Sequence, residues 1–120
     1  MLERTCLSVK ETGACVVGMP AKDTIKISDR NKMVESTPAR EKVWLVQTPQ
    51  AFRYSLIKES YESIRCKDMS GITDDAMIVE QERGVKVALV HGSYENLKIT
   101  TPEDLIIAEA FLRCGIVKNK

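Results

Sequence analysis

Three short segments of this chain place a basic side chain close to hydroxyl groups, near the ends of expected strands and helices. They are residues 22–24 (Lys-Asp-Thr), 37–40 (Thr-Pro-Ala-Arg) and 96–98 (Asn-Leu-Lys), the last followed by Thr100 and Thr101. Ammonium and guanidinium groups supply charge, while hydroxyls and helix N-termini supply directed donors, and together these suit a phosphate. They indicate phosphoryl or nucleotidyl transfer, in which the protein positions reactants and neutralises charge on phosphate oxygens.

Lys98 lies in a short apolar segment, expected to be a strand, just before a strong helix signal. Thr101 is expected to cap the helix, Pro102 suits its first position, and Glu103 and Asp104 complement the positive end of its dipole. Gly115 is expected to end it. One face is expected to be buried, formed by Leu105, Ile106, Ala108, Phe111 and Leu112. The pattern alone leaves open whether Lys98 binds a ligand or extends into solvent.

The remaining elements predict a layered α/β domain. A helix over residues 1–10 should end at Gly13, followed by a strand over 14–19, a hairpin over 24–35 and a strand over 43–46. We expect Thr48 and Pro49 to begin a second helix, with a face of Phe52, Leu56, Ile57, Tyr61 and Ile64. Thr73 is expected to cap a third helix that ends at Gly84, and a strand should follow over 85–90.

The hairpin contains few apolar residues and has little to bury by itself. We therefore expect it to be a projecting arm that packs on another chain. Asp74 and Asp75 could form a metal site, but acidic residues in the first turn of a helix more often serve its dipole, and the helix interpretation is favoured. His91, which follows an apolar strand, is interpreted as a turn residue and not as a catalytic base.

Composition limits the possible partners. With 18 basic and 17 acidic residues the net charge is +1, so neither nucleic acid nor an anionic membrane is indicated. No apolar run approaches the roughly 18 residues of a membrane helix. The four cysteines include no Cys-x-x-Cys pair, which favours reduced thiols, no protein-bound metal and a cytoplasmic location. No signal peptide and no glycine-rich phosphate loop are visible.

Five segments in order give the chain a specific resemblance. Residues 20–26, 37–40, 44–52 (including Gln-Thr-Pro-Gln), 72–76 and 92–105 (including Asn-Leu-Lys-Ile-Thr) resemble the carboxy-terminal half of the 2-C-methyl-D-erythritol 4-phosphate cytidylyltransferase family. The resemblance runs from about residue 13 to residue 112. It implies a Rossmann-like nucleotidyltransferase three-layer sandwich with a projecting β-arm, residues 1–120 forming a single partial domain and 22–43 the dimerisation arm.

The resemblance also implies an activity: CMP is transferred from CTP to 2-C-methyl-D-erythritol 4-phosphate with release of pyrophosphate, in non-mevalonate isoprenoid biosynthesis. A divalent cation, usually Mg²⁺, would be bound mainly through the CTP phosphates. Lys98 matches the lysine that stabilises the transition state near the α-phosphate. Thr24 and Arg40 match residues on an arm that holds the sugar phosphate in the partner subunit of a homodimer, and Thr73 matches another substrate-contacting threonine.

Two alternatives remain open at this point. Ribitol-5-phosphate cytidylyltransferase shares most of these motifs and acts on another polyol phosphate. Alternatively, the chain is a non-catalytic dimerisation module, because the family's amino-terminal glycine-rich loop is not in the sequence. For the same reason the chain by itself is expected to be inactive.

Overall fold

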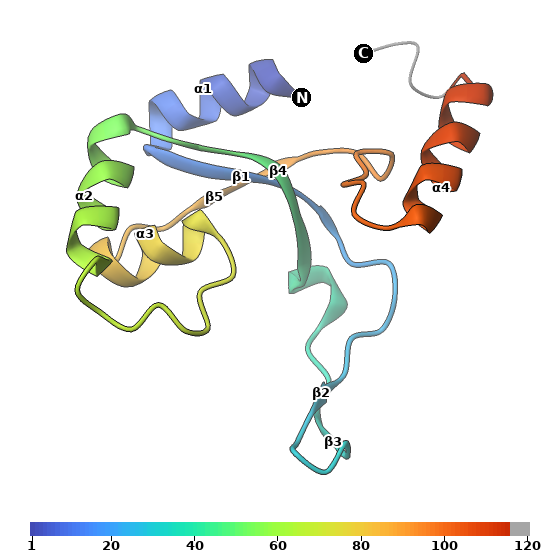
Figure 1. Ribbon diagram of the computed structural model, residues 1–120, viewed down its shortest axis with the longest axis horizontal. Coiled ribbons are helices and arrows are strands. Elements are labelled where there is room, and N and C mark those ends of the chain that lie inside the picture. The colour runs from blue at the N-terminus through green and yellow to red at the C-terminus, as the bar shows by residue number, and fades with distance from the viewer. Residues whose placement is uncertain (116–120) are drawn as a thin grey trace.

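The fold is built around one central strand. The computed structural model describes residues 1–115, so the last part of the predicted 1–120 domain, 116–120, lies outside the described residues. Strand β1 (Ala14–Pro20) is the middle of a three-stranded sheet of order β4-β1-β5 (Figure 1). It pairs antiparallel with β4 (Trp44–Phe52) and parallel with β5 (Ala88–His91). This mixed sheet with helices confirms the predicted α/β class.

The first residues of β1 are apolar and buried, as expected for the central strand of a sheet. Cys15 and Val17 are fully buried and pack with Val90 of β5, and burial raises the pKa of the Cys15 thiol. A bulge interrupts the pairing with β4 between Val16 and Gly18. A Cβ atom at Gly18 would lie 2.9 Å from the backbone oxygen of Leu45, so the close approach of β4 requires glycine at this position.

Three helices surround the sheet. Helix α1 (Leu2–Thr12) ends, as predicted, at Gly13, which adopts a left-handed conformation with φ of 83°. Figure 1 shows α1 above the strands, with α3 (Asp75–Arg83) below them beside α2 (Tyr54–Ile64). α2 packs against α3, and the buried side chains of these two helices include Ser60, Ile64, Ile78 and Val79. Within residues 1–115, no helix is both long enough and apolar enough to span a bilayer.

The predicted helix start at Thr48 and Pro49 is wrong, because strand β4 continues through both residues to Phe52. β4 pairs with β1 on both sides of these two residues, and Gln50 lies opposite Val16 in the register. Pairing with a strand distant in sequence therefore overrides a local helix-start signal. The Thr48–Pro49 peptide is cis, and α2 begins only at Tyr54, which leaves Phe52 in the strand.

The third helix is capped one residue later than predicted. Asp74, not Thr73, has the extended backbone of an N-cap, and its side chain accepts a hydrogen bond from the backbone N–H of Met77. The Thr73 hydroxyl instead contacts the sulfur of Met77 at 3.7 Å. The predicted end of the helix at Gly84 is confirmed, with φ of 60°.

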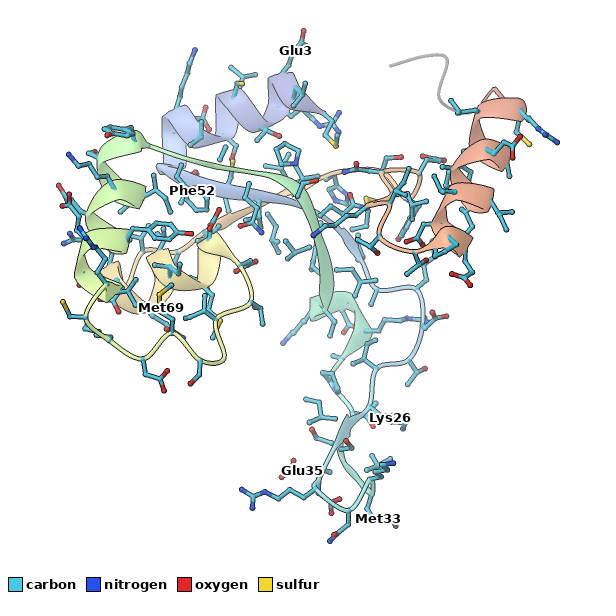
Figure 2. All side chains as sticks on the ribbon, viewed as in Figure 1. Glu3, Lys26, Met33, Glu35, Phe52 and Met69 are labelled. Atoms are coloured by element: carbon cyan, nitrogen blue, oxygen red, sulfur yellow. The ribbon has the colours of Figure 1, made fainter. Side chains whose placement is uncertain are left out.

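The predicted hairpin is present as a separate two-stranded sheet of β2 (Ile27–Ser28) and β3 (Val34–Ser36). Lys26 Nζ donates to the Thr37 hydroxyl at 2.9 Å and so joins its two sides. Figure 2 shows Lys26, Met33 and Glu35 on this projection, well away from the main sheet. Its apolar side chains are exposed in the chain described here: Ile27, Met33 and Val34. A short 3₁₀ turn (Arg40–Lys42) leads from the hairpin into β4.

The last helix, α4 (Pro102–Arg113), is capped as predicted but packed differently. Thr101 and Asp104 form a reciprocal capping box with Pro102 in the first turn. The predicted burial of its apolar face is wrong, because no residue of α4 is buried and Figure 1 shows the helix standing apart from the sheet. The predicted strand at Lys98 is also absent. No neighbouring strand among residues 1–115 supplies backbone hydrogen bonds to this segment, which is an irregular loop.

Candidate functional site

An open cavity of about 870 Å³ lies along β4. β4 contributes its residues Leu45 to Gln50 apart from Pro49, while Met19 comes from β1. The loop before α4 and the start of α3 contribute the remaining lining: Tyr94, Asn96, Leu97, Lys98, Thr73, Asp74 and Asp75. The cavity therefore lies where a strand, a loop and a helix N-terminus meet, an arrangement that brings charged and polar groups together from distant parts of the chain.

The loop is attached to β4 through the side chain of Gln47. Its Nε2 donates to the backbone oxygen of Ser93 at 2.7 Å, and its Oε1 accepts from the backbone N–H of Ser93 at 3.4 Å. Asn96 adds a second attachment, because its Nδ2 donates to the backbone oxygen of Thr48 at 2.8 Å and to Oε1 of Gln47 at 3.3 Å. The side chains of two amide residues thus hold the segment that carries Lys98.

The start of α3 is attached to the same strand through Gln50. Nε2 of Gln50 donates to Oδ2 of Asp74 at 2.9 Å, and Oε1 accepts from the backbone N–H of Ala76 at 3.2 Å. The carboxylate of Asp74 therefore caps the helix with one oxygen and binds β4 with the other. Gln47 and Gln50 hold two different walls of the cavity from one strand.

The base of the hairpin also contacts the loop. The Tyr94 hydroxyl donates to the backbone oxygen of Pro20 at 2.9 Å, and Lys22 Nζ lies 3.6 Å from the centre of the Tyr94 ring, a cation–π contact. Arg40 donates from its guanidinium to the backbone oxygen of Lys22 at 2.8 Å. These contacts connect the root of the hairpin to one side of the cavity.

The structure brings together two of the four residues predicted for the site. Lys98 and Thr73 both line the cavity, and both side chains are exposed. Thr24 and Arg40 do not line it, because they belong to the segment that leads into and out of the hairpin. Within a single copy of the chain the four residues therefore do not form one constellation.

The acidic residues of the cavity already have protein partners. Asp74 is hydrogen-bonded through both oxygens, and Asp75 accepts from the Tyr61 hydroxyl, a hydrogen bond that raises the pKa of Tyr61. Residues 1–115 contain no group of three or more histidine, cysteine or acidic side chains close enough to hold a metal ion. The donor set of this part of the protein does not fit a dedicated Mg²⁺ site.

His91 lies outside the cavity lining. Its ring packs edge-on against Trp44 with ring centres 4.7 Å apart, and its backbone oxygen accepts from Arg4 at 2.8 Å. The interpretation of His91 as a turn residue is wrong, because it is the last residue of β5 and pairs with Gly18 of β1.

Sequence reasoning used Gln47, Gln50 and Asn96 only as parts of motif strings and assigned them no role. A usable signal was present, because two amide side chains three residues apart, Gln47 and Gln50, stand in a segment that is apolar apart from Thr48. Buried or half-buried polar side chains are normally hydrogen-bonded, so a pair in one strand indicates fixed partners elsewhere. The identity of those partners could not be read from the spacing.

Chemically, the cavity combines the Lys98 ammonium with threonine hydroxyls and amide groups, which suits a phosphorylated and hydroxylated ligand. The sequence profile of the 2-C-methyl-D-erythritol 4-phosphate cytidylyltransferases (IspD) matches residues 1–114. The chain belongs to this family. Its members are nucleotidyltransferases of isoprenoid biosynthesis by the non-mevalonate pathway. The predicted family is therefore confirmed.

Relatives within the cytidylyltransferase family define how much of such a protein the chain represents. It is similar to the enzyme of Alkaliphilus oremlandii, with 53% identity over 113 residues, which is 94% of this chain and 47% of that protein. The Lachnoclostridium phytofermentans enzyme is 52% identical over 105 residues, covering 88% of this chain and 45% of its own length. The chain thus spans about half the length of the curated relatives it matches.

A solved structure with the same fold supports the family assignment. The 4-diphosphocytidyl-2C-methyl-D-erythritol synthase of Anaerococcus prevotii superposes with a TM-score of 0.86 at 40% identity, covering 93% of this chain and 51% of that chain. The mixed sheet and the separate hairpin are therefore features of a cytidylyltransferase fold.

Proposed function

We propose that the protein to which this chain contributes transfers CMP from CTP to 2-C-methyl-D-erythritol 4-phosphate. A phosphate oxygen of the methylerythritol phosphate forms a bond to the α-phosphorus of CTP, the bond between the α- and β-phosphates breaks, and pyrophosphate leaves. Membership of the cytidylyltransferase family supports this reaction. The observation that supports assigning this reaction to particular residues is that Lys98 lines the cavity.

Lys98 is the proposed catalytic residue and also contacts substrate. Negative charge increases on the phosphate oxygens as the new bond forms, and an ammonium held beside them lowers the energy of the transition state more than that of the bound substrate. Thr73, which also lines the cavity, is proposed to supply a hydroxyl for substrate binding. The presence of both residues on one cavity supports this assignment.

Thr24 and Arg40 are proposed to bind the sugar phosphate in the cavity of a second copy, with residues 22–43 as the dimerisation arm. Two observations support this arrangement. Neither residue lines the cavity of its own chain, and the arm presents exposed Ile27, Met33 and Val34, which a partner surface would cover. A homodimer would then complete each site with residues from both subunits.

We infer that residues 1–115 belong to a Rossmann-like three-layer nucleotidyltransferase domain.

Mg²⁺ is proposed to arrive with the phosphates of CTP, where it would neutralise their charge. The carboxylates of Asp74 and Asp75 support this view, because their hydrogen bonds to protein groups occupy them. The free thiols of exposed Cys6, Cys66 and Cys114 are in keeping with a reducing, cytoplasmic setting.

The function can be tested in a restored enzyme, defined here as this chain fused behind the amino-terminal half of the Alkaliphilus oremlandii relative. Pyrophosphate release from CTP is measured with 2-C-methyl-D-erythritol 4-phosphate and, separately, with ribitol 5-phosphate. We expect turnover with the first substrate and much less with the second. The amino-terminal half alone and this chain alone serve as controls and should be inactive. Turnover with ribitol 5-phosphate only would overturn the substrate assignment.

A further inference from the structure

Lys98 lies on a segment that no strand holds. Residues 96–100 have no regular secondary structure, and neither sheet among residues 1–115 includes them. A flexible ammonium that must act on a particular phosphate oxygen needs a fixed backbone, because misplacement by about 1 Å can cost roughly 100-fold in rate. The hydrogen bonds that fix this loop are therefore relevant to the chemistry.

The side chain of Gln47 replaces the missing strand partner. Its primary amide carries one carbonyl oxygen and one N–H donor toward Ser93, and these pair with the backbone N–H and oxygen of that residue at 3.4 and 2.7 Å. This two-point pairing is the pattern that a neighbouring peptide unit would provide in a sheet. The residues are separated by 46 positions in the chain, so the bond joins β4 to the loop directly.

Two further contacts connect this pairing to Lys98. Oε1 of Gln47 also accepts from Nδ2 of Asn96, which itself binds the backbone oxygen of Thr48, and Asn96 is two residues before Lys98. Gly92, just before Ser93, leaves space for the amide. A Cβ atom there would collide with Oε1 of Gln47 and would lie 2.5 Å from Cγ1 of Val17.

We propose that Gln47 is a positioning residue that acts through Lys98, by holding residues 93–98 against β4. This inference rests on the proposed role of Lys98 in nucleotidyl transfer. Gln47 itself need not touch the reacting phosphates. Its removal should leave Lys98 present but incorrectly placed, so that turnover falls while ground-state binding of CTP changes little.

The first experiment is a double-mutant cycle in the restored enzyme, with Gln47→Leu and Lys98→Ala made singly and together. Gln47→Leu is expected to lower kcat roughly 10- to 100-fold with less than about a 2-fold change in KM for CTP. In the Lys98→Ala background the same substitution should have almost no further effect, because the group that it positions is gone. An equal loss of kcat in both backgrounds would overturn the inference.

The second experiment measures the loop directly by hydrogen exchange of peptides that cover residues 93–98. Gln47→Leu should accelerate hydrogen exchange in these peptides. The control is Gln81→Leu, which replaces an exposed glutamine on α3 outside the cavity lining and should leave the exchange unchanged. Unchanged exchange in Gln47→Leu would show that the loop is held by other contacts and would refute the inference. If Lys98→Ala leaves kcat unchanged while exchange responds to Gln47→Leu, the proposed role of Lys98 fails but the attachment of the loop stands.

Discussion

The side-chain amide of Gln50 donates a 2.9 Å hydrogen bond to Oδ2 of Asp74, the residue that caps α3. Because Oδ1 of Asp74 accepts from Met77 N–H, a single carboxylate joins strand β4 to the first turn of the helix. This relationship fixes one wall of the cavity, as Gln47 fixes another. It also gives the carboxylate of Asp74 a structural role at the start of α3.

A double-mutant cycle on the free energy of unfolding should detect the coupling between Gln50 and Asp74. Gln50→Leu is expected to cost about 1–3 kcal/mol, because it leaves the Ala76 N–H and one Asp74 oxygen without their protein partner. Asp74→Ala should cost about 1 kcal/mol through loss of the cap. The two losses should be non-additive by at least 0.5 kcal/mol in urea unfolding of the restored enzyme, on the order expected for contacting residues. Gln50→Leu combined with Asp68→Asn, in a distant loop, should be additive.

Lys98 should matter for turnover far more than for binding. Lys98→Ala in the restored enzyme is expected to lower kcat by roughly 100-fold or more, with a much smaller rise in KM, because the ammonium acts mainly on the transition state. Steady-state pyrophosphate release measures both constants. Lys86→Ala is the matched control, since it removes an exposed lysine outside the cavity lining. A kcat equal to that of the unsubstituted enzyme would contradict the assigned role.

The arm can be tested by mixing two inactive enzymes. Lys98→Ala and Arg40→Ala variants of the restored enzyme should each be nearly inactive. After they are unfolded and refolded together, hybrid dimers should contain one intact site, giving roughly a quarter of the normal activity. Separately refolded and then briefly mixed samples are the control. If the mixture stays as inactive as its components, Arg40 does not serve the partner's cavity.

Gly18 should tolerate no side chain. Gly18→Ala would place a methyl group 2.9 Å from the Leu45 backbone oxygen, and a backbone atom cannot rotate away as a side chain can. We expect a loss of about 1–3 kcal/mol, measured as a lower urea midpoint. Gly71→Asn serves as the control, because nothing lies within 4 Å of the corresponding Cβ position and asparagine accepts positive φ. An unchanged urea midpoint for Gly18→Ala would show that β4 can shift away from position 18 and contradict this prediction.

Acid should loosen the start of α4. Backbone N–H groups of Thr100 and then Thr101 donate to Asp104 and lower the pKa of its carboxyl below the ordinary 3.8. A lowered pKa means that the stabilisation is complete above that ordinary value and is lost as the pH falls through the lower, folded-state value. The amide NMR shifts of Thr100 and Thr101 should follow this transition at strongly acidic pH.

Two substitutions test whether this acid transition comes from the Asp104 cap or from another acidic group in α4. Asp104→Asn should remove the acid transition of the Thr100 and Thr101 amides, whereas Glu103→Gln, one residue away, should keep it. Persistence of the transition in Asp104→Asn would assign it to another group.

Elements whose signals lie within a few residues could be predicted from the sequence. The end of α1 at Gly13, strand β1, the hairpin, the stop of α3 at Gly84 and the capping box of α4 all depend on local backbone preferences. Caps and left-handed glycines act within one turn, so the order of the residues contains the information. Lys98 and Thr73, two of the residues predicted for the site, line the same cavity, and their roles stay predictions.

The tertiary structure decided which residues far apart in the sequence contact each other. Thr48 and Pro49 look locally like a helix start, but pairing of Gln50 opposite Val16 keeps them in β4. Gln47 meets Ser93 across 46 positions, and that contact, not a strand, holds Lys98. Hydrogen-bond partners so far apart are chosen by the packing of the whole sheet. The sequence therefore determined which groups could act on a phosphate, and the fold determined which of them meet.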